Sequence, residues 1–180
     1  MKGIFFTTFL EMVEQLYSAN MVDDIIAKSN LPSEGAYTTV GSYHHSELVS
    51  LVHTLSTLTG ESLNYILSQY GAHIFHELFK LNAHFFKKRE TAFDLLESLN
   101  IYVEVEILKL YPNERMPSFQ TKRLDTNRLL FTYRSPHAFL VVIEGFLQAC
   151  FKYYNTSAQM VVHDHKPLNG AHADFEIILQ

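Results

Sequence analysis

Residues 119–134, FQTKRLDTNRLLFTYR, indicate the fold class, because they contain two short strand-like runs around a turn. The runs 119–124 and 129–134 flank Asp125-Thr126-Asn127, and residues of these types favour turns. The stretch therefore predicts a β-hairpin, and with it an antiparallel sheet in the second half of the chain.

A second hairpin and a set of helices surround this stretch. Residues 159–163 and 175–179 predict the second hairpin, with Pro167, Asn169 and Gly170 in its turn. Apolar residues recur at helical spacing before the first hairpin, and Ser135-Pro136 is typical of a helix start between the two. The expected helices cover residues 5–16, 22–26, 46–60 with Ser46 as cap, 62–79, and 136 to about 154.

Residues 93–110 fit two patterns. Leu96, Leu99, Val103 and Leu110 recur at helical spacing, whereas residues 103–107 alternate apolar and acidic side chains like a strand. The length of the segment favours a helix. The order of helices, hairpin, helix and hairpin predicts an α+β fold with an antiparallel sheet, as one domain over residues 1–180.

Composition excludes several classes of function. The net charge is −5 with no basic stripe, so a nucleic-acid partner is not expected. The single cysteine, Cys150, excludes an internal disulfide and fits a reducing compartment. No signal peptide, membrane-length apolar run, nucleophile elbow or phosphate loop is visible. We expect a cytoplasmic protein that is not an enzyme.

Several short stretches carry a resemblance to a known family. In order they are MKGI at 1–4, GAYTTVGSY at 35–43, KLYP at 109–112 with MPSF at 116–119, and YRSP at 133–136 followed by Glu144-Gly145. Together they make the chain similar to the H-NOX, or haem-NO-binding, family, which includes the sensor domain of soluble guanylate cyclase and stand-alone bacterial gas sensors. The resemblance implies haem b between a helical lobe (residues 1–60) and a mixed lobe (residues 61–180), and it places Pro117 beside the haem.

The residue at the family's iron-ligand position is unusual. The family ligates iron through a histidine shortly before the KLYP stretch, and Glu104 stands there in this chain. A carboxylate is a hard ligand that suits ferrous haem poorly, and haem iron is usually held by His, Cys, Met or Tyr. A carboxylate without metal is the favoured alternative for Glu104. Tyr102 does not share its helix face.

The resemblance also assigns a site for the haem propionates. The family pattern Tyr-x-Ser-x-Arg becomes Tyr133, Ser135 and His137 here, so an imidazole replaces the guanidinium that pairs with a carboxylate. The gas side of the pocket is expected to be apolar, which favours NO or CO over O₂, because bound O₂ needs a hydrogen-bond donor. Its expected lining is Phe5, Phe9, Ile74, Val142 and Phe146, five residues that fit an ordinary core equally well.

Histidines near the second hairpin indicate a separate metal site. His163 and His165 share one strand face, and His172 lies across the expected hairpin. Zinc needs three or four convergent ligands, so these three imidazoles are a candidate zinc site.

Two functions remain open at this point. The first is a haem-based nitric-oxide sensor with weakened or altered haem binding, which signals to a kinase, a cyclase or a cyclic-dinucleotide enzyme. The second is a haem-free regulatory or protein-interaction domain that keeps the fold, with its pocket collapsed or holding another apolar ligand.

Overall fold

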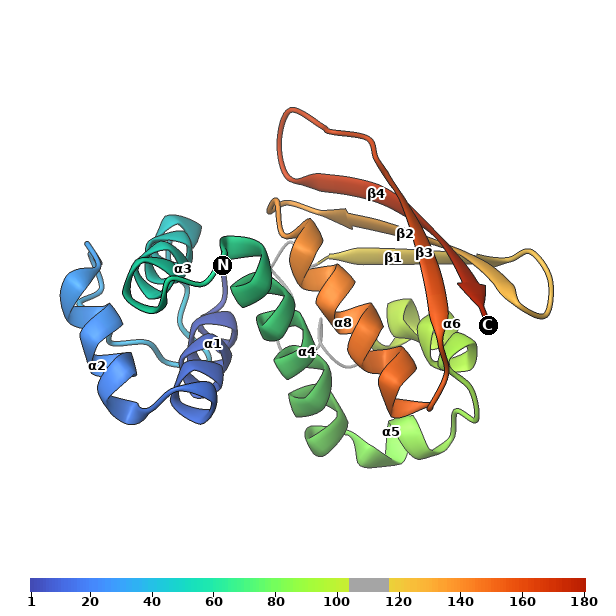
Figure 1. The fold of residues 1–180 in the computed structure, drawn as a ribbon, viewed down its shortest axis with the longest axis horizontal. Helices are drawn as coiled ribbons and strands as arrows, with labels where there is room; N and C mark the ends of the chain where they lie inside the picture. Colours follow the sequence, from blue (N-terminus) through green and yellow to red (C-terminus); the bar gives the residue numbers. More distant parts are fainter. Residues whose placement is uncertain (104–116) are drawn as a thin grey trace.

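The computed structural model describes residues 1–103 and 117–180, and Figure 1 shows its helices and sheet. The first three helices form one end of the molecule, and a four-stranded sheet with its covering helices forms the other. The elements are α1 (Gly3–Leu16), α2 (Ala19–Lys28), α3 (His45–Thr59), α4 (Leu63–Leu81), α5 (Ala83–Lys87), α6 (Ala92–Tyr102), β1 (Ser118–Arg123), β2 (Arg128–Ser135), α8 (Leu140–Tyr153), β3 (Ala158–Asp164) and β4 (Ala171–Leu179).

Side-chain caps fix the starts of several helices. Ser18 and Ser62 each accept a hydrogen bond from a backbone amide in the first turn of α2 and α4. Thr91 and Asp94 form a reciprocal capping box at the start of α6, which satisfies two otherwise free amides. The expected cap Ser46 is wrong, because the cap of α3 is His44, whose ring nitrogen accepts from the Ser46 amide at 3.3 Å.

The four strands form one antiparallel sheet in the order β1-β2-β4-β3. Side chains alternate between its two faces, so one face is apolar and buried while the other faces solvent. Helices α6 and α8 lie against the buried face (Figure 1). The central residues of that face are Leu129, Phe131, Tyr133, Ala173, Phe175 and Ile177.

Two apolar cores share helix α4. Ile66 and Tyr70, in its first half, belong to the core of the helical end, whereas Phe75 belongs to the core beneath the sheet. Ile74 packs against both cores. The helical end and the sheet end are therefore joined through a continuous helix rather than through a loop.

Helices α4 and α8 touch backbone to backbone. A Cβ atom on Gly71 would lie 1.9 Å from the carbonyl oxygen of Val142, and one on Gly145 would lie 2.1 Å from that of Ser68. Both distances are far below a van der Waals contact, so each glycine is required by the neighbouring helix rather than by its own backbone conformation. This contact places residues 142–146 of α8 directly beside residue 71 of α4.

The α+β fold class and the antiparallel sheet are confirmed. The predicted start of α8 is wrong: the helix begins at Leu140 instead of Pro136, because β2 continues to Ser135 and the Ser135 hydroxyl accepts from the His137 amide, which forms a turn before the helix. The strand β4 begins at Ala171, four residues earlier than predicted, and α2 spans Ala19–Lys28 rather than 22–26. None of the helices in the described ranges combines the length and the apolarity that crossing a bilayer requires.

Candidate functional site

The end of β2 gathers polar side chains that the sequence assigned to carboxylate binding. Tyr133 and Ser135 are two residues apart on a strand, so their side chains lie on the same face, and the Ser135 hydroxyl partly offsets the effect of burial on the pKa of Tyr133. Burial raises the pKa of the Tyr133 phenol, so this hydroxyl keeps its proton and can donate a hydrogen bond. The His137 amide donates to Ser135 Oγ at 3.1 Å. All three predicted residues are thus brought together.

Two further imidazoles lie in a row with His137, His45 next to it and His44 next to His45. The His45 ring lies 5.2 Å from the His137 ring, between centroids, and the His44 ring lies 4.8 Å from that of His45. His45 is the first residue of α3, so this contact joins the helical end of the molecule to the end of β2. Sequence reasoning missed it, since His45 and His137 are far apart in the chain and no local pattern relates them.

Pro117 lies near this polar end. It is partly buried and directly precedes β1, whose first residue, Ser118, pairs with Arg134. The register therefore places Pro117 at the level of Ser135. Glu104, with the segment 104–116 that contains the KLYP stretch, lies outside the described residues.

The five predicted apolar residues lie along the boundary between the two cores. Phe9 and Phe146 are buried, one in each core. Ile74 and Val142 are partly exposed, and the contact of Gly71 with Val142 holds their two helices together. Phe5 is partly exposed, and its carbonyl oxygen accepts a 2.7 Å hydrogen bond from the Tyr70 hydroxyl, which ties α1 to α4.

The residues in place suit a flat ligand that carries carboxylates. Five apolar side chains from α1, α4 and α8, namely Phe5, Phe9, Ile74, Val142 and Phe146 (the apolar wall), offer dispersion contacts and carry no hydrogen-bond donor of their own, which suits one face of a porphyrin. The hydroxyls of Tyr133 and Ser135 are donors of the kind that a propionate accepts, and His137 adds an imidazole. The chemistry of these side chains thus suits the carboxylate edge and one apolar face of haem.

The predicted zinc residues occupy the solvent face of the sheet. His165 and His172 are brought together, with ring centroids 4.3 Å apart. His163 pairs with Asp174 in the strand register, on the same face. Among the described residues, the donor atoms of His165, His172 and Asp174 lie within 4.8 Å of one another. Sequence reasoning missed Asp174, although its place two residues after His172 puts it on the same face of a strand.

A family model described as Haem-NO-binding matches residues 2–162 of the chain. No curated protein matches. Among solved structures, the unliganded Fe(II) H-NOX protein from K. algicida is 32% identical with a TM-score of 0.86, and the match covers 100% of this chain and 97% of that one.

Two less similar structures share the fold. The H-NOX protein from S. oneidensis in the Fe(II)NO state is 22% identical with a TM-score of 0.86, covering 100% of this chain and 99% of that one. An oxygen-binding H-NOX domain related to soluble guanylate cyclases is 15% identical with a TM-score of 0.84, covering 100% and 95%.

Proposed function

Since the chain belongs to the haem-NO-binding (H-NOX) family of haem-based gas-sensor domains, we propose that it is a nitric-oxide sensor domain with altered iron ligation. Domains of this family are sensors rather than enzymes, so the expectation of no catalytic activity is confirmed. The proposed output is a conformational change that is passed to a separate kinase, cyclase or cyclic-dinucleotide enzyme.

The cluster of Tyr133, Ser135 and His137 carries this proposal. A buried phenol that keeps its proton, a hydroxyl on the same strand face and an imidazole two residues further along form a set of hydrogen-bond donors at the end of β2. Donors that converge on one point fix the orientation of a carboxylate ligand. In this proposal Tyr133 and Ser135 donate to the propionates of haem b, and His137 takes the place of the family's arginine.

The apolar wall determines which gas is favoured. Haem, when bound, supplies the iron that holds a diatomic gas. Phe9, Ile74, Val142 and Phe146 have no side-chain donor, so they exclude water and offer no hydrogen bond to a bound gas. We therefore propose NO and CO as ligands in preference to O₂.

Glu104 accounts for the altered ligation. A single carboxylate in place of an imidazole is a poor partner for ferrous iron, so haem retention has to depend more on Tyr133, Ser135 and the apolar wall. The trigger also differs, because the usual release of an iron–histidine bond has no counterpart at a glutamate.

Reconstitution with hemin tests the proposal. The full chain is loaded, its Soret band is recorded under reducing conditions with and without NO, and haem loss to an excess of apomyoglobin is timed. We expect a Soret band that shifts with NO. Glu104→His is expected to slow haem loss by about tenfold or more, in proportion to a restored strong ligand. Ser135→Ala is expected to speed haem loss.

Matched variants separate the outcomes. Glu106→Ala removes a neighbouring carboxylate and serves as the control for Glu104→Ala. If Glu104→Ala and Glu106→Ala lose haem at the wild-type rate, Glu104 is not a ligand. If neither the wild type nor Glu104→His forms a Soret band, the sensor proposal fails and the haem-free regulatory domain replaces it.

A further inference from the structure

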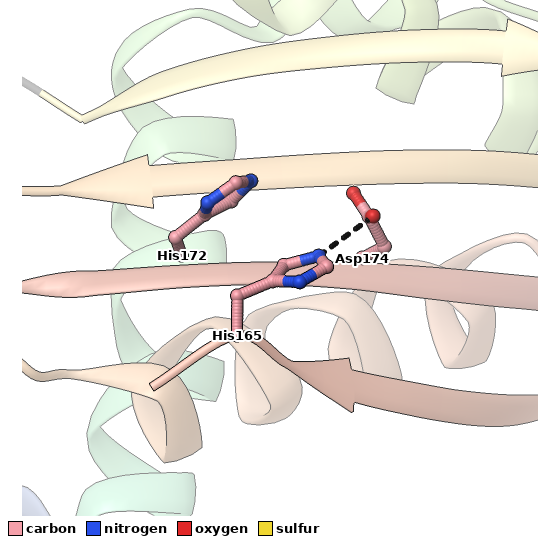
Figure 2. Close-up of side chains that lie close together, drawn as sticks. All are labelled: His165, His172 and Asp174. Carbon is pink, nitrogen blue, oxygen red and sulfur yellow. Dashed lines mark hydrogen bonds and ion pairs between the residues drawn. The ribbon is translucent and has the colours of Figure 1, made fainter. Parts of the chain in front are cut away.

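The solvent face of the β3–β4 hairpin brings together three metal-binding side chains. The His165 amide donates to the His172 carbonyl at 2.9 Å, which continues the ladder one step past β3 and sets the two residues opposite each other. Asp174 follows His172 by two residues on β4 and shares its face. Figure 2 shows the three side chains side by side, with the hydrogen bond between His165 and Asp174.

We propose that His165, His172 and Asp174 bind a first-row divalent metal ion, with Zn²⁺ as the best-suited occupant. Two imidazoles and a carboxylate are the donor set of zinc and its neighbours, whereas Ca²⁺ and Mg²⁺ prefer sites built wholly from oxygen. Three protein ligands leave the fourth tetrahedral position to water, as the exposed setting allows.

The distances suit an ion after small side-chain movements. Because the three donor atoms lie within 4.8 Å of one another, a point within about 2.8 Å of all of them exists, and zinc ligands lie at about 2.0–2.2 Å. Each donor therefore has to move by less than about 1 Å. The side chain of His165 is 43% exposed, which leaves room for a movement of this size. The ion replaces the 2.9 Å hydrogen bond between His165 and Asp174.

Thr132 on β2 positions the carboxylate. Its hydroxyl donates to Asp174 Oδ1 at 2.6 Å, while Oδ2 faces His165. One oxygen of Asp174 is thus held by the neighbouring strand and the other is directed toward the two imidazoles. Groups that orient a ligand in this way are a regular part of metal sites, and their loss weakens binding.

Arg134 is a cation that shares the sheet face of the proposed ligands. Arg134 pairs with His172 across β2 and β4, so its guanidinium belongs to the same face and opposes a cation. The next acid along β4, Glu176, is already paired with Arg128. Arg134 is therefore expected to lower the affinity of the site, and Arg134→Gln is expected to raise it.

The proposed ion would lie close to the carboxylate-binding cluster of Tyr133, Ser135 and His137. The turn that joins β3 to β4 packs on the end of β2, where a Cβ atom on Gly170 would lie 2.1 Å from the Ser135 carbonyl oxygen. A shallow hollow of about 320 Å³ lined by Ser135, Pro136, Pro167 and His172 lies at this junction. Metal binding would thus fix the hairpin end that supports Ser135.

Titration of the purified full chain with ZnCl₂ tests the site. Calorimetry is expected to give one equivalent of bound Zn²⁺, and Co²⁺ is expected to give the intense visible bands of a four-coordinate ion. His172→Ala and Asp174→Asn are expected to weaken Zn²⁺ binding by about 100-fold or more, and Thr132→Val by about tenfold, as for other orienting groups. Circular dichroism verifies that each variant is folded.

Two control variants test whether Zn²⁺ binding depends on the three proposed ligands alone. His53→Ala removes an exposed histidine from α3 and is expected to leave the affinity unchanged. His163→Ala is also expected to retain binding. Loss of Zn²⁺ with His163→Ala and retention with Asp174→Asn would overturn this donor set. Equal binding by the wild type, His172→Ala and Asp174→Asn, or no binding by the wild type, would overturn the site.

Discussion

Replacing Gly145 by alanine probes the backbone contact between α4 and α8. The new Cβ would lie 2.1 Å from the Ser68 carbonyl oxygen and 2.8 Å from Ser68 C and Cα. Real Cβ contacts are rarely closer than 3.0 Å, so α8 has to withdraw by about 1 Å. Overpacking costs about 1–3 kcal/mol, and the obstacle is the backbone of a helix, so about 3 kcal/mol applies.

The better helix propensity of alanine offsets about 1 kcal/mol of this cost. We therefore expect the free energy of unfolding to fall by about 2 kcal/mol and the Tm by roughly 4–8 °C for a chain of this length. Urea unfolding followed by circular dichroism measures the change. Asn64→Ala, at an exposed position of α4, is the control and should remain within about 0.5 kcal/mol of the wild type. A Gly145→Ala protein as stable as this control would refute the close contact.

Three further outcomes are expected. Tyr70→Phe leaves the Phe5 carbonyl without its 2.7 Å donor and should lower the free energy of unfolding by about 1 kcal/mol in the same urea assay; an unchanged midpoint would contradict the hydrogen bond. Burial raises the pKa of the Cys150 thiol to about 12, so a thiol reagent such as Ellman's reagent should modify native protein far more slowly than urea-unfolded protein, and equal rates would disprove this. The Thr132 hydroxyl, together with His165, holds the pKa of Asp174 below its ordinary value of 3.8. The ionised carboxylate therefore stabilises the fold above this ordinary value, and the contribution is lost as the pH falls through the lower pKa of the folded state. The difference in free energy of unfolding between the wild type and Asp174→Asn should therefore become smaller in acid. A difference that grows on acidification would contradict the lowered pKa of Asp174.

Periodicity and turn residues predict most of the elements. Apolar spacing identifies α1 to α4, and both hairpins lie where Asp125 to Asn127 and Pro167 to Gly170 place their turns. The predicted ends of strands and starts of helices are less accurate, because these boundaries depend on single side-chain hydrogen bonds. Ser135 illustrates this: the pair Ser135-Pro136 resembles a helix cap, yet its hydroxyl closes a turn at the end of β2.

The residues of the candidate sites also differ in how well the sequence predicts them. The carboxylate-binding residues are close in sequence, so a family pattern predicts their cluster. The contact of His45 with His137 is a tertiary contact, which a single sequence does not contain. Asp174 could have been found, because it shares a strand face with His172. The predicted hairpin brings His165 and His172 together, whereas the hydrogen bond of His165 to Asp174 follows from the place of Asp174 on the same face of β4 as His172.

Helix α4 connects the helical end of the molecule to the sheet end. It passes from one core to the other between Tyr70 and Phe75, without a break in its hydrogen bonding. A change in the angle between the helical end and the sheet end would therefore bend this helix. The bend should concentrate at Gly71, where the missing side chain makes the helix least stiff and where the backbone of α8 acts as a fulcrum.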